Sequence, residues 1–227
     1  MNRSRATSVI TRSATVALVA LATATLTGCL SSAIPAGSPA TPSTMPPSPT
    51  PTPSTSTPST DTDVPASLSF DDGALLPESA YIEWGDALLI DDDWEVASPD
   101  DGNGSWTYGT VDGTCTAQFW QGFTSDVETV ARDDSASSDA ILATLLQEDV
   151  AAVSPHATDG GFSYQVGGNT DVEQRQITGQ QDDRVWIMAA RAFTATGVGV
   201  YLIVDCSGGD ANAVFAEVVD KNAIIVH

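Results

Sequence analysis

The chain has 227 residues, of which 30 are acidic and eight are lysine or arginine, giving a formal net charge of −22 at neutral pH. Nucleic acid is excluded as a partner, because phosphate contacts need a basic surface, and direct adhesion to an anionic lipid surface is disfavoured for the same reason. With two histidines and three cysteines, the sequence also offers no cluster with the spacing of zinc ligands.

The start of the chain predicts an export signal. Arg3, Arg5 and Arg12 precede an uncharged run from Ala14 to Leu26, which is the order of a positive n-region and a short apolar h-region. The run has 13 residues, whereas a helix that crosses a bilayer needs roughly 20. We therefore expect a removable signal rather than a permanent membrane helix.

The signal closes on Leu26-Thr27-Gly28-Cys29, which resembles the lipobox of bacterial lipoproteins. The resemblance implies that residues 1–28 are removed and that Cys29 becomes the lipidated first residue of the mature protein. Two or more acyl chains give stable anchoring where one is marginal. A cell-membrane protein, held by lipid on the extracytoplasmic face, is therefore implied. An ordinary signal or signal anchor with an incidental Cys29 is the alternative.

Residues 29–66 predict a disordered linker after the lipidated cysteine. From Leu30 to Ala66 the chain is almost wholly Pro, Ser, Thr, Ala and Gly, and it holds ten of the 13 prolines. Such a segment buries too little apolar surface to offset its ordering entropy. Extended at roughly 3.1 Å per residue, it could hold a domain ~110 Å from the bilayer. The composition is also typical of O-glycosylated stalks, which is the alternative.

Residues 67–227 predict one acidic extracytoplasmic domain. They contain all five tryptophans and are long enough to bury a core. Their 28 acidic residues face only five basic ones. The single lysine and the abundant Ala, Thr, Val, Asp and Gly are typical of GC-rich genomes, so this lipoprotein resembles those of actinobacteria.

Asp112-Gly113 lies between alternating strand formers, which is the signature of a type I′ β-hairpin. With these two residues as the loop, Thr110 faces Cys115, and the register sorts the side chains onto two faces. The apolar face holds Trp106, Tyr108, Cys115, Ala117 and Phe119, and the mostly polar face holds Ser105, Thr107, Thr114, Thr116, Gln118 and Trp120.

Trp120 is the one large aromatic side chain on that mostly polar face. We favour a position under a helix that covers the second face of the sheet. The alternative is an exposed contact for a ligand or partner.

Residues 185–206 predict two longer strands joined around Thr194–Gly197, with Cys206 on the apolar face of the second. Once Cys29 carries lipid, Cys115 and Cys206 are the remaining cysteines, and outside the membrane two buried cysteines favour a disulfide. In the chain-entropy treatment, closing a loop of about 90 residues constrains the unfolded state by roughly 4.6 kcal/mol as an upper figure. Two unpaired buried thiols are the alternative.

Two further stretches predict helices. The first follows the capping cluster Ser135–Asp139 and keeps apolar residues at helical spacing to Val153. The second begins near Asp210 and places Glu217 four residues before Lys221. Other strands are expected at Tyr81–Ile90, Trp94–Ala97, Phe162–Val166, Val172–Thr178 and Ala223–Val226.

This order of elements predicts a single α+β domain in which an antiparallel sheet packs with two helices. It resembles the PsbP-like α/β/α sandwich, a likeness that by itself implies no function.

No catalytic motif is present: the sequence lacks a G-x-S-x-G elbow, a phosphate loop, H-E-x-x-H and C-x-x-C. His156 lies beside a proline and His227 is the last residue, which are poor places for a buried base. We therefore expect a non-catalytic binding or interaction domain that needs no cofactor and recognises an unidentified protein or envelope ligand. A glycosidase-like envelope hydrolase is the alternative, since that chemistry needs only two carboxylates at the right separation.

Acidic loops supply one more alternative, a calcium-dependent binding module. Asp91 and Asp93, and separately Asp101, Asn103 and Asp112, offer the oxygen ligands that calcium prefers. Neither series has the glycine of an EF-hand loop at its sixth position. Solvated loops that keep a secreted domain soluble are the simpler interpretation.

Overall fold

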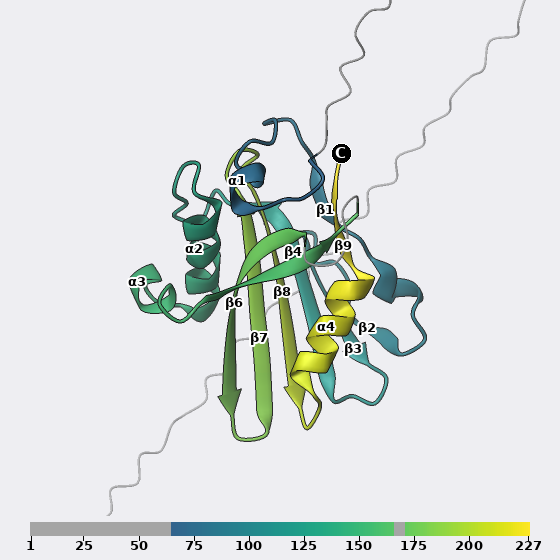
Figure 1. Ribbon diagram of the computed structural model, residues 1–227. Helices are drawn as coiled ribbons and strands as arrows, with labels where there is room; N and C mark the ends of the chain where they lie inside the picture. Colours follow the sequence, from purple (N-terminus) through teal and green to yellow (C-terminus); the bar gives the residue numbers. More distant parts are fainter. Residues whose placement is uncertain (1–64, 166–170) are drawn as a thin grey trace, which may run out of the picture. The chain divides into compact units, whose positions relative to one another are not determined.

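The computed structural model describes residues 65–165 and 171–227. In these residues a nine-stranded sheet has the order β1-β9-β5-β6-β7-β8-β4-β3-β2 (Figure 1). The expected signal, Cys29 and nearly all of the linker lie outside this part of the chain. The strands are β1 (Ile82–Trp84), β2 (Trp94–Ser98), β3 (Ser105–Thr110), β4 (Cys115–Phe123), β5 (Thr158–Tyr164), β6 (Val172–Gln181), β7 (Arg184–Phe193), β8 (Val198–Ser207) and β9 (Ala223–Val226).

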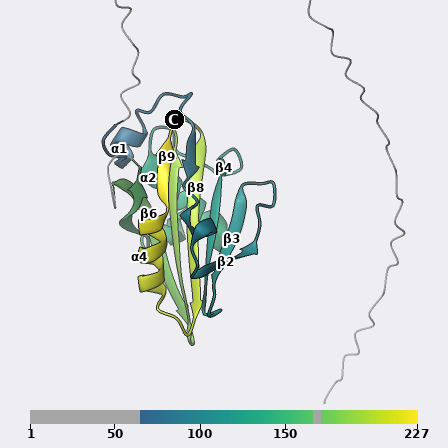
Figure 2. The same cartoon turned by 90° about the vertical axis from the view of Figure 1, so that its right-hand side faces the viewer.

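Two longer helices, α2 and α4, accompany the sheet, with short helical turns between the strands. Figure 1 shows α2 and α3 beside β6, and α4 in front of the sheet. In the turned view α4 lies at the left and strands β2 and β3 at the right (Figure 2). The helices are α1 (Phe70–Gly73), α2 (Asp134–Leu146), α3 (Val150–Val153) and α4 (Ala211–Lys221), with one 3-10 helix, η1 (Ala87–Ile90).

The helices cover both faces of the sheet. Because successive strand residues point to opposite faces, β7 contributes to two separate buried clusters, one with α4 and one with α2. The expected α+β domain with two main helices is thereby confirmed. On the α4 side the strands contribute Ile187, Ala189, Val200, Leu202 and Val204, and on the α2 side they contribute Ala190 and Ala192.

The expectation of a wholly antiparallel sheet is wrong at one pair. Strand β9 runs parallel to β5, with Ser163 opposite Ala223 and Tyr164 opposite Ile224. After β8 the chain passes through α4 before it enters β9. Strands β5, β6, β7 and β8 alternate in direction, so β8 runs opposite to β5, and the chain reverses through α4 to enter β9 in the direction of β5.

The register predicted for the β3–β4 hairpin is confirmed, with Trp106 opposite Phe119 and Tyr108 opposite Ala117. The turn type is wrong. A type I′ turn needs positive φ at both central residues, and here only Gly113 has it, at 72°. The amide of Gly113 instead donates to the Thr110 carbonyl over 2.8 Å. The Asp112 carboxylate accepts from the Thr110 hydroxyl and the Thr114 amide, which stabilises the longer turn.

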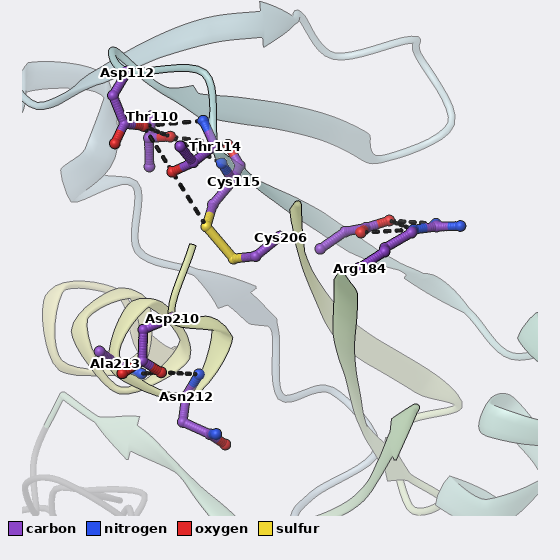
Figure 3. Close-up of a disulfide and its surroundings, with 10 residues drawn as sticks. Thr110, Asp112, Thr114, Cys115, Arg184, Cys206, Asp210, Asn212 and Ala213 are labelled. Atoms are coloured by element: carbon purple, nitrogen blue, oxygen red, sulfur yellow. Dashed lines mark hydrogen bonds and ion pairs between the residues drawn. A yellow bond between two sulfur atoms is a disulfide. The ribbon is translucent and has the colours of Figure 1, made fainter. Parts of the chain in front are cut away.

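The disulfide between Cys115 and Cys206 is present, as predicted (Figure 3). The two residues lie directly opposite each other on neighbouring strands β4 and β8, and their Cα atoms are 4.1 Å apart. Both side chains are buried. The bond therefore ties the β3–β4 hairpin to a central strand of the sheet.

Helix α2 differs from its prediction at both ends. It begins at Asp134, because the Asp133 carboxylate caps it by accepting from the Ala136 amide, so the predicted capping cluster lies inside the helix. Ser138 is fully buried there, and its hydroxyl donates to the Asp134 carbonyl. The helix ends at Leu146, where Gln147 takes left-handed φ at 56°. The run to Val153 is therefore two helices. The second predicted helix is confirmed as α4, with its Glu217–Lys221 ion pair.

The strand expected over Tyr81–Ile90 is wrong in its second half. The chain leaves the strand after Trp84 and turns into η1, whose first amide, on Ala87, donates to the Asn222 side chain. Leu88 is buried by this turn, while Ile90 is exposed. The other strands are confirmed with shifted ends: the one expected at Phe162–Val166 runs from Thr158 to Tyr164, and Val166 lies outside the described residues.

A buried ion pair joins the N-terminal segment of the domain to α2 and β7. The side chains of Arg191 and Asp134 are both fully buried, and their charged atoms lie 2.9 Å apart. Arg191 also donates to the Ser69 carbonyl over 2.8 Å and to the Glu173 carbonyl over 2.9 Å. Burial lowers the pKa of Arg191 to about 10 against the opposing effect of Asp134. The guanidinium is therefore held by its partners at a considerable desolvation cost.

Two aromatic rings and a threonine complete this cluster. The Arg191 guanidinium carbon lies 4.5 Å from the Phe70 ring centroid and 4.8 Å from that of Phe193. The second carboxylate oxygen of Asp134 accepts from the amide and the hydroxyl of Thr194. Both members of the ion pair are thus hydrogen-bonded beyond each other.

Replacing Asp134 with alanine is expected to lower the free energy of unfolding by about 3–5 kcal/mol, because it leaves a buried guanidinium without its counterion. Asp205→Ala is the matched control. It removes the partner of Arg184 in an ion pair whose side chains are 52% and 26% exposed, so it is expected to cost less than about 1 kcal/mol. Urea denaturation of the two variants measures the difference, and equal losses would contradict the assignment.

Candidate functional site

A pocket of about 330 Å³ lies between β1, η1 and the strands β2, β3 and β4. Its wall combines aromatic rings, two carboxylates, an amide and two exposed aliphatic side chains. The lining residues are Trp84, Asp86, Leu89, Val96, Ser98, Pro99, Asp100, Trp106, Tyr108 and Gln121. This volume is at the small end of the range for ligand sites.

The aromatic wall is supported from behind by Phe119, a fully buried residue of β4. The Trp106 ring stacks on Phe119 with centroids 5.5 Å apart and planes 9° apart. Trp84 and Tyr108 meet the same ring edge-on at 5.3 Å and 6.2 Å. Because all three rings rest on one buried side chain, the wall is built before any ligand arrives.

Asp86 is held in this pocket by Tyr108. The Tyr108 hydroxyl donates to the Asp86 carboxylate over 2.6 Å. Burial, followed by that hydrogen bond, raises the pKa of Tyr108 well above its ordinary value, so the hydroxyl remains a donor. Asp86 itself is exposed and precedes η1 without capping it. Its remaining acceptor positions are therefore open to a ligand.

Asp100 enters from a loop that is attached to β4. Its carboxylate accepts from the Gly102 amide over 2.8 Å. The loop then reaches β4, where the backbone amide of Gln121 donates to the Gly104 carbonyl over 2.9 Å. The Trp120 indole donates to the Asn103 carbonyl over 3.1 Å. These bonds determine where the second carboxylate stands.

β1 and β4 are the first and the seventh strands in the sheet order. They are nevertheless hydrogen-bonded to each other, and this contact forms the pocket. The Trp84 amide donates to the Gln121 side chain over 2.8 Å, and the Trp84 indole donates to the Trp120 carbonyl over 3.1 Å. The strongly curled sheet thus brings one edge strand back across β4. Gln121, which lines the pocket, supplies part of that closure.

One polar atom in the wall has no partner. The indole nitrogen of Trp106 is buried and makes no hydrogen bond within the described residues. Leu89 and Val96 are respectively 60% and 50% exposed at the same pocket. Together with the two carboxylates, the pocket therefore has polar groups that can form further hydrogen bonds and apolar side chains that a ligand can cover.

Trp120 lies at the margin of the face covered by α2. It is half-buried and stacks on Tyr201, with centroids 5.2 Å apart and planes 13° apart. A Cβ placed at Gly199 would lie near both Trp120 and Ile141 of α2. Through its bond to Asn103, Trp120 contributes to the pocket by positioning the loop of Asp100.

The proposed calcium ligands are engaged in separate local interactions. Asp91 pairs with Lys221 over 2.6 Å, and this hydrogen bond lowers the pKa of the Asp91 carboxyl. Asp101 accepts from the Asn103 amide over 2.7 Å, whereas Asp112 is bound to the threonines of its own turn (Figure 3). Within residues 65–165 and 171–227 no three His, Cys, Asp or Glu side chains are grouped as metal ligands.

Asp93 lies apart from the aromatic pocket. It lines a separate hollow beside the Cys115 disulfide, which it shares with Asp112. Asp210 and Glu217 line the same hollow, but among the described residues no three such side chains are grouped as metal ligands.

Sequence patterns did not single out the pocket residues. Trp84, Trp106 and Tyr108 alternate as core residues do, and they are largely buried. Asp86 and Asp100 lie in acidic stretches with many equivalents. Trp84 followed two residues later by Asp86 is a local pattern that joins a ring and a carboxylate of the pocket, and it is a weak signal.

Comparisons with known proteins add little. No protein family matches the chain, and no curated protein matches it. A crystal structure from Bacteroides thetaiotaomicron VPI-5482 is 13% identical over 65% of this chain and 46% of that one, with a TM-score of 0.34. The match thus spans less than half of that protein, and so distant a likeness carries no argument. In the described residues no helix is both long and apolar enough to cross a membrane.

Gly104→Ala is expected to destabilise the fold more than Gly102→Ala. Both glycines have left-handed φ, at 78° and 81°, so each alanine costs about 1–2 kcal/mol of backbone strain. A Cβ on Gly104 would also lie 2.0 Å from the Gln121 carbonyl oxygen, whereas one on Gly102 would meet nothing within 4 Å.

The excess for Gly104→Ala is expected to be at least about 1 kcal/mol, measured by chemical denaturation of the two variants. Equal losses would mean that the loop of Asp100 is not fastened to β4 as described.

Proposed function

We propose that this chain is a lipid-anchored protein of a bacterial envelope whose folded domain binds a ligand in the aromatic pocket without catalysing a reaction. The export signal, the lipobox-like sequence ending in Cys29 and the proline-rich linker support the anchor. The observation that carries the binding function is the pocket itself, which is lined by three rings backed by Phe119 and by two exposed carboxylates.

Binding is favoured over catalysis by the state of the pocket's polar groups. The lining residues include neither histidine nor cysteine, and the Tyr108 hydroxyl is occupied as a donor to Asp86. Asp86 and Asp100 are both exposed, whereas a carboxylic acid that acts as a general acid is usually enclosed by apolar groups.

A carboxylate-based hydrolase is the second candidate, because Asp86 and Asp100 line one pocket beside aromatic rings. Glycoside chemistry uses a pair of this kind. We also propose that the fold resembles a PsbP-like α/β/α sandwich, a likeness that carries no functional argument.

Cys29→Ala is expected to abolish lipidation and cleavage before residue 29, because the lipid is attached to that thiol. Mass spectrometry of the mature terminus and metabolic labelling with a fatty acid measure both effects. Cys115→Ala is the control that keeps the lipobox intact. A Cys29→Ala product that still carried lipid and had the wild-type terminus would contradict the anchor.

The binding function can be tested with a photo-crosslinking residue placed at Val96 in the full-length protein on its native cells. Val96 is a pocket residue and 50% exposed, and Val130, 49% exposed, is the matched control that does not line this pocket. We expect a discrete adduct at position 96, lost when Trp106→Leu is added, and none at position 130. Equal labelling at both positions, or none at either, would contradict a binding role for the pocket.

A further inference from the structure

The two carboxylates of the aromatic pocket have no cationic partner. Neither Asp86 nor Asp100 takes part in any of the ion pairs found in the described residues. The domain has five basic side chains apart from histidine, and four of them are paired elsewhere. Those four are Arg175, Arg184, Arg191 and Lys221. The fifth, Arg132, lines a different hollow near Leu75.

The aromatic rings add a second attraction for positive charge. The face of an indole or phenol ring carries negative potential, so cations bind to it, and more strongly when water is partly excluded. Trp84, Trp106 and Tyr108 line the same pocket as the carboxylates. Of these three rings only Trp106 is partly exposed, and a neutral ligand stacked on it would leave both carboxylates uncompensated.

The apolar side chains define what else the ligand carries. Leu89 and Val96 are largely exposed where they line the pocket. Covering them with methylene groups is favourable by the usual apolar burial term. A compact ammonium on a short aliphatic stem satisfies the carboxylates, the rings and these side chains together.

The charge of the whole domain favours the same ligand. Its 28 acidic residues against five basic ones create a negative field, which raises the local concentration of cations and speeds their association. The unfilled acceptor positions on Asp86 and Asp100 suit an ammonium group with several N–H donors.

We propose that the aromatic pocket binds a primary alkylammonium group, with the ammonium between Asp86 and Asp100 and its stem against Leu89 and Val96. This inference rests on the proposed binding function, because it names the ligand class of the same pocket. A lysine side chain of an envelope protein and a free alkylamine present the same chemistry.

The test is a titration of the mature, lipidated protein in detergent, followed by tryptophan fluorescence and by the indole N–H signals in NMR spectra. The probes are Nα-acetyl-lysine methylamide, its Nε-acetylated form, n-butylamine and tetramethylammonium. We expect a saturable shift with the first probe and at least about tenfold weaker binding once acetylation removes its charge.

The remaining probes separate the two sources and the type of ammonium. If n-butylamine binds as well as the lysine compound, a free alkylamine suffices; if the lysine compound binds more tightly, a peptide-borne lysine is the better ligand. Either result supports the inference. Tighter binding of tetramethylammonium than of both primary amines would overturn it, because hydrogen bonds to the carboxylates would then contribute nothing.

Variants localise the effect. Asp86→Asn and Asp100→Asn are each expected to weaken binding about fivefold, because each removes one charge-assisted hydrogen bond at an exposed site. Asp92→Asn is the control. It changes the net charge by the same amount, and Asp92 is exposed but does not line the pocket. An equal loss in Asp92→Asn would overturn the inference by showing a bulk charge effect.

Two other results would also overturn it. One is no spectral shift with either primary amine at up to about 50 mM, far above the millimolar dissociation constant expected for one small cation. The other is equal affinity for the acetylated probe. In both cases an adduct at position 96 in cells would still support binding of another ligand class, so the two proposals fail separately.

Discussion

The buried pair of Arg191 and Asp134 is the constraint on which the arrangement of the domain depends. A guanidinium without exposure is tolerated only when its charge and most of its N–H groups are met inside the protein. Here Asp134 at the start of α2 and the carbonyls of Ser69 and Glu173 accept from the two terminal nitrogens of Arg191, while its buried Nε has no partner among the described residues. The side chain leaves so little room that a Cβ at Gly73 would lie 2.1 Å from it. The N-terminal segment, β6, β7 and α2 are therefore held in one arrangement.

The curl of the sheet is the second constraint, and it produces the pocket. Trp84 of β1 bonds to Gln121 and to the Trp120 carbonyl of β4, so an edge strand returns across the sheet. The same tryptophan lines the pocket beside Trp106, whose ring is stacked on Phe119. Side chains that close the fold thus also shape the candidate site. Substitutions there need a stability measurement alongside any binding measurement.

A binding role agrees with the organisation inferred for the whole chain. A lipid anchor and an extended linker would present an acidic domain at a distance from the membrane. Its charge would repel the anionic bilayer and attract cationic molecules. In the proposed function, Asp86 and Asp100 would turn that general attraction into a specific site, since both are exposed and neither forms an ion pair within the described residues.

Local patterns in the sequence determined the β3–β4 register, the β7–β8 pair and the cysteine pairing, because strand alternation and the two available thiols are properties of short segments. They also determined the α+β class. Only the tertiary structure decided that β9 lies beside β5, that buried serines such as Ser138 belong inside α2, and that Asp86 and Asp100 share a pocket. These features depend on contacts between residues far apart in the chain, such as Trp84 with Gln121, which no local periodicity records.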